Sequence, residues 1–174
     1  MREPNWFEKK FEFVLPVEDF PAVIERVRGT PARLEEIVRS YSPDVLTAQP
    51  EGEWTIQQHV GHLSDLDELH DGRLDDFDEG KDALRPADLS NAKTEQANHN
   101  AASISDLLAT FREVRMRFVD RLEAMDETAA ARVSFHPRLQ KPMRVIDLAL
   151  FVAEHDDHHL AAIRWLSTNV DAPA

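Results

Sequence analysis

The chain has 174 residues, of which 42% are apolar, so we expect one domain over residues 1–174 with its core at about 20–168. It has no cysteine, which excludes disulfides, iron–sulfur clusters and cysteine ligands, and it has neither a membrane span nor a signal peptide, so we expect a cytoplasmic protein. The net charge of −13 argues against binding of nucleic acid and is explained most simply by solubility.

The spacing of apolar residues predicts helix over most of the chain. The first helix is expected from Phe20-Pro21 to about Ser40, with Thr30-Pro31 as a candidate break. The second is expected from Trp54-Thr55 to about Asp78, with Thr55 as its cap. Residues 79–100 are polar and are expected to form a loop with a short helical turn.

A third helix is expected from about Ser103 to Met125, where apolar residues form a clear helical stripe. Residues 133–143 indicate a short extended arm or irregular hairpin. The fourth helix, from about Val145 to Ser167, is apolar on most sides at its start and therefore belongs in the middle of the structure. Four long helices predict an all-α protein, a four-helix bundle with two long crossovers.

Two histidines in the stretch His155-Asp-Asp-His-His159 stand at positions i and i+4 of the fourth helix. On a helix both imidazoles leave the same face about one turn apart, a spacing that allows them to bind one metal ion. They continue an inward stripe with Phe151, and buried imidazoles need a hydrogen bond or a metal. The same spacing arises by chance, so a metal pair and a hydrogen-bonded core pair both remain open.

The second helix offers a third ligand, because His62 shares a stripe with Leu66 and Leu69 and should face the core. His59, one turn earlier, is its competitor. His158 must point about 100° away from His159 and is expected at the rim of a pocket. The remaining histidines have polar or loop-like neighbours and are expected to be surface or structural residues; they are His70, His99 and His136.

The charged residues near these histidines allow two interpretations of their role. Asp65 follows His62 by one turn, and Asp156 and Asp157 lie between the paired histidines. Such carboxylates either orient ligating imidazoles or lie on a solvated face; we expect the solvated face for Asp157 and leave Asp65 open. Asp65 is also a candidate general base and Arg73 a candidate anion clamp, although residues of both types usually lie at the surface.

Three segments resemble the DinB-like superfamily of metalloenzymes. They are the tryptophan-led helix start at residues 54–63, the turn Phe135-His136-Pro137 and the last helix at residues 151–163. Their order and separation fit the family over roughly residues 20–167. Many members carry a glycine in the turn that follows the proline, whereas this chain has Arg138-Leu-Gln-Lys-Pro142, which suggests a longer turn.

The resemblance implies a DinB-type bundle with an up-up-down-down layout and a divalent metal, usually zinc or nickel. Its metal ligands would map onto His62, His155 and His159. Members of the family often form homodimers. Some are transferases that attach the low-molecular-weight thiols bacillithiol or mycothiol to electrophiles, and others are isomerases.

Three neutral histidines would leave a bound ion its full charge and leave positions open for water and substrate. The chemistry expected is therefore metal-assisted hydrolysis of a small molecule, or transfer of a small thiol to an electrophile. A rival reading is a non-catalytic bundle with a structural metal, closed by His59 or Asp65 as fourth ligand. A bundle with a hydrogen-bonded histidine cluster and no metal is a third.

Overall fold

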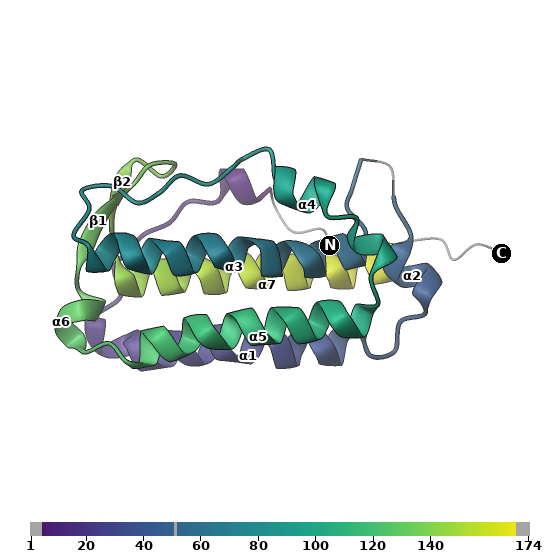
Figure 1. Ribbon diagram of the computed structural model, residues 1–174, viewed down its shortest axis with the longest axis horizontal. Helices are drawn as coiled ribbons and strands as arrows, with labels where there is room; N and C mark the ends of the chain where they lie inside the picture. Colours follow the sequence, from purple (N-terminus) through teal and green to yellow (C-terminus); the bar gives the residue numbers. More distant parts are fainter. Residues whose placement is uncertain (1–4, 51, 170–174) are drawn as a thin grey trace.

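The computed structural model describes residues 5–50 and 52–169. Four long helices dominate it: α1 (Phe20–Val38), α3 (Ile56–Asp78), α5 (Ile104–Glu123) and α7 (Val145–Asn169). They form two layers, with α3 beside α7 and α5 beside α1 (Figure 1). The prediction of an all-α four-helix bundle is confirmed.

Short elements connect and cover these helices. They are η1 (Trp6–Glu8), η2 (Val17–Asp19), α2 (Pro43–Thr47), α4 (Ala92–Gln96), η3 (His99–Ala101), α6 (Glu127–Ala130), β1 (Val133–His136) and β2 (Lys141–Arg144). The two strands form the expected hairpin, antiparallel, with Val133 opposite Arg144 and His136 opposite Lys141. The turn between the strands spans residues 137–140. Gln140 has φ = 53°, in the left-handed region that favours glycine, so a glutamine takes the place that glycine often has in such turns.

The directions of the helices differ from the layout implied by the family resemblance. Arg121, near the end of α5, contacts Asp71 and Asp75 near the end of α3, so these helices are parallel. Residues 79–103 therefore cross the length of the bundle, whereas the other two connections return at the end where they start (Figure 1). The order is up-down-down-up with one long crossover, and the expectation of an up-up-down-down order with two crossovers is wrong.

The start of α3 is fixed by a capping box. The Thr55 hydroxyl accepts a hydrogen bond from the Gln58 backbone N–H at 3.0 Å, and the Gln58 side chain accepts one from the Thr55 backbone N–H at 2.9 Å. Both interactions satisfy donors that the first helical turn leaves without partners. The predicted cap at Thr55 is confirmed, and it sets where the inward stripe of α3 begins.

The apolar core is divided into two clusters. One lies toward the hairpin and includes Val27, Leu74, Phe118 and Val152. The other lies toward α2, and its members include Leu34, Val60, Phe111 and Ile163. Each long helix carries buried polar residues between the clusters; they include Thr30, Asp67, His70, Arg115, His155 and Asp156. A polar layer therefore crosses the bundle at mid-height.

Arg115 is the centre of this polar layer and is 1% exposed. Its Nε and Nη2 donate to the two carboxylate oxygens of Asp67 on α3, both at 2.9 Å. Its Nη2 also donates to Asp156 Oδ1 on α7 at 3.0 Å, and its Nη1 donates to the other oxygen of Asp156. From α1, the Thr30 hydroxyl donates to Asp156 Oδ2 at 2.7 Å. The guanidinium thus binds side chains of α3 and α7 directly, and Asp156 extends the link to α1.

The electrostatics of the layer follow from burial. Burial raises the pKa of Asp67 to about 6, against the attraction of Arg115. Burial by itself would lower the pKa of Arg115, but the two carboxylates outweigh it and raise that pKa, so the guanidinium stays charged. The layer therefore requires all of its members together, because each charge is solvated by the others rather than by water.

Helix α1 runs without a break through Pro31, contrary to the expected interruption at Thr30-Pro31. Proline has no backbone N–H, so the carbonyl of Val27 loses its usual donor four residues later. Nη1 of Arg115 lies 3.5 Å from that carbonyl oxygen and takes the place of the missing donor. The polar layer thereby accommodates the proline.

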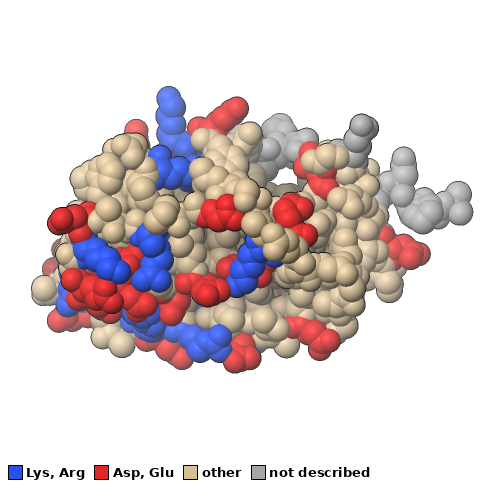
Figure 2. Space-filling view, turned by 45° about the horizontal axis from the view of Figure 1, so that its top comes forward, with Lys and Arg blue, Asp and Glu red and all other residues tan. Residues whose placement is uncertain are grey.

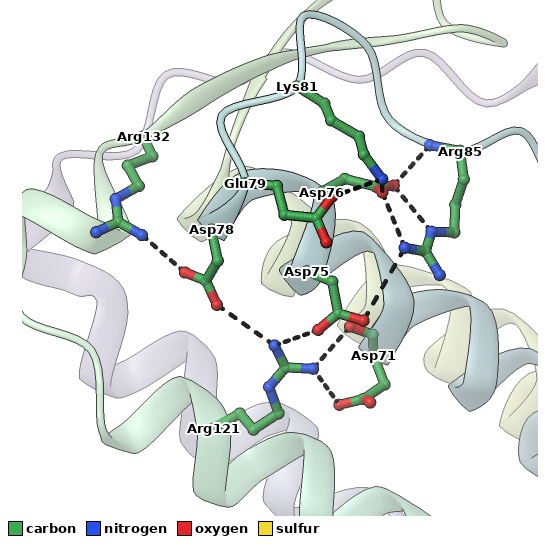
Figure 3. Close-up of polar contacts among 9 residues, drawn as sticks. All are labelled: Asp71, Asp75, Asp76, Asp78, Glu79, Lys81, Arg85, Arg121 and Arg132. Carbon is green, nitrogen blue, oxygen red and sulfur yellow. Dashed lines mark hydrogen bonds and ion pairs between the residues drawn. The ribbon is translucent and has the colours of Figure 1, made fainter.

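The acidic end of α3 is paired with basic residues of neighbouring segments (Figure 3). Arg121 contacts Asp71, Asp75 and Asp78, while Lys81 and Arg85 both bind Asp76. Toward the hairpin end, the face in Figure 2 accordingly shows acidic and basic groups side by side.

Within the described ranges, no helix is both long enough and apolar enough to cross a membrane.

Replacing Arg115 with methionine should lower the free energy of unfolding by about 3–5 kcal/mol, because it leaves two buried carboxylates without a counter-charge. The control is Arg112→Met on the same helix, whose partner Glu35 lies at the surface, and which should cost about 1 kcal/mol or less. Urea unfolding followed by circular dichroism measures both values. Equal losses in the two variants would contradict the assignment.

Candidate metal centre and its pocket

The structure brings together His62 of α3 with His155 and His159 of α7. One ring nitrogen from each lies within 4.8 Å of the others, and all three side chains are buried. The Nε2 atoms of His155 and His159 are 3.1 Å apart. The cluster forms because α3 and α7 pack antiparallel, and because the i, i+4 spacing points both α7 imidazoles at the same turn of α3.

The donor set fits a small divalent ion. Two imidazole nitrogens on one tetrahedral zinc ion stand about 3.3 Å apart, close to the separation of the two Nε2 atoms. Burial lowers the pKa of His62 to about 4 and lowers the pKa values of His155 and His159 well below the usual value. The rings are therefore neutral at neutral pH, as metal binding requires.

A chain of hydrogen bonds orients His62. The Thr94 hydroxyl donates to Asp65 Oδ2 at 2.9 Å, so it accepts from His62 Nδ1, 3.0 Å away, and this tautomer leaves the lone pair on Nε2. His99 Nε2 also contacts Asp65 Oδ2 at 2.9 Å. Its ring packs so closely on Gly61 that an added Cβ would lie 2.3 Å from it. Asp65, left open from the sequence, therefore acts on the cluster through Thr94.

His59 and His158 flank the cluster without joining it. The Nδ1 atoms of His59 and His159 are 2.7 Å apart, so His59 holds the outer nitrogen of His159 and leaves the inner one facing the cluster. Burial lowers the pKa of His59 to about 3. His158 is half-buried, lines the pocket and lies 5.7 Å from the Trp6 ring, which matches its expected place at the rim.

The cluster opens into a pocket of about 670 Å³. Its walls are largely aromatic and aliphatic and include Trp6, Trp54, Leu66, Leu69 and Phe151. Among the residues that the structure describes, no fourth histidine, aspartate or glutamate joins the three-histidine group. An ion held by these nitrogens would therefore keep a side toward the pocket, as catalytic sites do and closed structural sites do not.

Four residues for which a surface position was one of the expected alternatives are buried. Arg73 is 1% exposed and lines the pocket, and His70 and His136 are each 1% exposed. His99 is buried as well. The polar or loop-like chain neighbours of the histidines give no sign of this burial, which depends on contacts with segments far away in the sequence. The alternative expectation for the three histidines, a structural place, fits better.

The two aspartates inside the histidine stretch have separate positions. Asp156 is fully buried and pairs with Arg115, rather than orienting an imidazole or facing solvent. Asp157 is half-buried at the surface and forms ion pairs with Arg26 and Arg33 of α1, which fits the expected solvated face.

Sequence reasoning missed three contributors to the site. Trp6, from η1, packs its ring 5.0 Å from that of His155, and Arg138, in the hairpin turn, lines the pocket. Thr94 lies in the crossover and reaches His62. None of them belongs to a periodic pattern, and the only available signal was the aromatic pair Trp6-Phe7 within a charged segment.

Comparison with known proteins agrees with this geometry. The model of the DinB superfamily matches residues 26–163, so the chain belongs to that superfamily. YfiT of Bacillus subtilis, provisionally assigned as a metal-dependent hydrolase, is 27% identical over 147 residues, covering 83% of this chain and 82% of YfiT. A solved structure of YfiT, described as a four-helix bundle of unusual topology, aligns with a TM-score of 0.79 over 92% of this chain and 93% of that one.

Replacing Thr94 with valine should weaken zinc binding by about 10–100-fold, because His62 loses the partner that fixes its tautomer and orientation. Calorimetric titration of metal-stripped protein with zinc measures the change. Thr47→Val, at a half-buried position of α2 that does not line the pocket, is the matched control and should bind as the wild type does. Unchanged affinity in Thr94→Val would refute this role.

We expect His136 to make the stability of the protein depend on pH, in a way that can be measured separately from the three-histidine cluster. Burial, together with nearby Arg73 and Arg138, lowers its pKa from 6.5 to about 4. Between these pH values His136 is protonated in the unfolded chain but stays neutral in the folded protein, so the free energy of unfolding decreases as the pH falls. His136→Gln should therefore lose up to about 3 kcal/mol less than wild type between pH 7 and 4 in urea unfolding. Parallel pH profiles of the two proteins would contradict the shift.

Proposed function

We propose that this protein is a metal-dependent hydrolase of a small molecule and that His62, His155 and His159 hold its ion. The observation that carries the proposal is the open side of the three-histidine cluster toward the pocket. The provisional assignment of its relative YfiT as a metal-dependent hydrolase supports the same class.

A divalent ion at this position supplies Lewis acidity, which activates water and polarises the bond under attack. Three neutral imidazoles suit zinc or nickel and leave the charge of the ion uncompensated. Thr94 holds His62 in the tautomer that presents a lone pair on Nε2, and His59 holds the outer nitrogen of His159. Trp6 and Trp54 pack on the histidine rings and limit the access of bulk water.

The structural-metal alternative would require a fourth protein ligand. The two residues named for that place are otherwise engaged, His59 with His159 and Asp65 with Thr94 and His99. Transfer of a low-molecular-weight thiol would use the same open side, and assays distinguish it from hydrolysis. The homodimer and the cytoplasmic location stay predictions.

The proposal is tested by metal analysis combined with activity assays. The purified protein should contain about one divalent ion per chain, and His155→Ala should lose it, whereas His158→Ala should retain it. The metal-loaded protein should hydrolyse one or more compounds in a panel of esters, amides and phosphate esters, and EDTA should abolish the activity. In a parallel assay, cysteine and glutathione are offered to the electrophile monochlorobimane.

Less than about a tenth of an ion per chain, with an unchanged melting temperature in His155→Ala, would refute the metal site. Metal-dependent conjugation of the thiols without any hydrolysis would refute the hydrolase and establish a thiol transferase at the same centre.

A further inference from the structure

The pocket is also lined by hydrogen-bond donors on its side toward the hairpin. Arg73 comes from α3, His136 from the end of β1 and Arg138 from the hairpin turn. Arg73 follows His62 by eleven residues, about 16 Å along the helix axis. These three residues, here called the basic end, line the same cavity as the three-histidine cluster, and the Trp6 ring packs against both Arg138 and His155.

The two guanidinium groups have few protein partners. Nε of Arg73 donates to the backbone oxygen of Arg85 at 3.2 Å, and within residues 5–50 and 52–169 neither Arg73 nor Arg138 forms an ion pair. The nearby carboxylate of Asp76 is already bound by Arg85 and Lys81.

Arg138 is held by aromatic rings rather than by an acid. Its guanidinium carbon lies 5.9, 5.5 and 5.6 Å from the ring centres of Trp6, Phe7 and Phe151. Its Nη2 is buried and has no hydrogen-bond partner. Rings packed against the guanidinium leave its N–H groups available to a ligand in the pocket.

His136 adds a third donor of defined position. Its Nδ1 accepts a hydrogen bond from the backbone N–H of Leu139 at 3.2 Å, so the neutral ring carries its proton on Nε2. Nε2 is buried and has no partner. A buried donor without an acceptor is costly, and a ligand that accepts from it would remove that cost.

The charges at this end repel one another. Burial, followed by the charge of Arg138, lowers the pKa of Arg73 to about 10, which still leaves it cationic at neutral pH. Unpaired buried cations are unfavourable, and a carboxylate or a phosphate can accept two N–H groups of a guanidinium at once.

We propose that Arg73, His136 and Arg138 form a subsite for an oxyanion group, a carboxylate or a phosphate, of the ligand that this pocket binds. Leu66 and Leu69 lie between Arg73 and His62 on α3 and line the same cavity. The ligand is therefore an amphipathic anion with an apolar middle. If the proposed hydrolase function holds, its scissile bond lies at the three-histidine end, and this part alone depends on that function.

Binding of three probes that share an apolar body tests the subsite: 4-phenylbutyrate, 3-phenylpropyl phosphate and the neutral 4-phenylbutyramide. Calorimetry is done on the full chain both as purified and after removal of metal with EDTA. At least one anion should bind ten or more times tighter than the amide in both forms, and the tighter of the two identifies carboxylate or phosphate.

Arg138→Gln should abolish that preference. If circular dichroism shows that this variant is poorly folded, Arg73→Lys takes its place and should reduce the preference. Arg132→Gln is the control, because Arg132 pairs with Asp78 on the surface outside the pocket, and it should behave as the wild type.

Equal binding of anions and amide would overturn the subsite. So would an anion preference that disappears with EDTA and is unaffected by Arg138→Gln, since the anion would then bind the metal itself. Loss of the preference with EDTA would overturn the subsite but leave the metal-dependent function intact. Conversely, a protein that binds no metal but still prefers the anion would support the subsite and refute the metal-dependent function.

Discussion

The buried guanidinium of Arg115 is the constraint on which the rest of the structure depends. It lies between the two apolar clusters, bound to Asp67 and Asp156, and it sets the level at which the long helices pack. Asp156 directly follows His155, so fixing this aspartate also fixes the turn of α7 that faces His62. Such buried ion pairs often add little net stability compared with an apolar core, but breaking one is costly, and this makes them suited to specifying register.

The histidine stretch of α7 gains a fuller interpretation from this layer. Five consecutive residues lie in four environments. His155 and His159 belong to the three-histidine cluster, and His158 lines the pocket. Asp156 pairs with Arg115 in the core, and Asp157 pairs with the arginines of α1. The helical rotation of about 100° per residue separates them. The carboxylates of Asp156 and Asp157 thereby point toward Arg115 and the arginines of α1 rather than toward the three imidazoles, whereas Arg73 and Arg138 line the same cavity.

The sequence predicted the four helices, the cap at Thr55 and the hairpin because these depend on local periodicity and turn chemistry. It also paired His62 with His155 and His159, since inward stripes on two helices limit which side chains can meet. It did not reveal Arg115, whose partners lie 48 and 41 residues away, or the passage of α1 through Pro31 that this arginine permits. The direction of each helix and the contributions of Trp6 and Arg138 likewise depend on long connections that carry no periodic signal.

The central claim is that one ion is held by three histidines and is open on its fourth side to the pocket. Anomalous diffraction at the zinc or nickel absorption edge, from crystals of the metal-loaded protein, tests it most directly. We expect a single peak between His62, His155 and His159, with no further protein ligand. A peak elsewhere, or one closed by a fourth side chain such as His59, would contradict it.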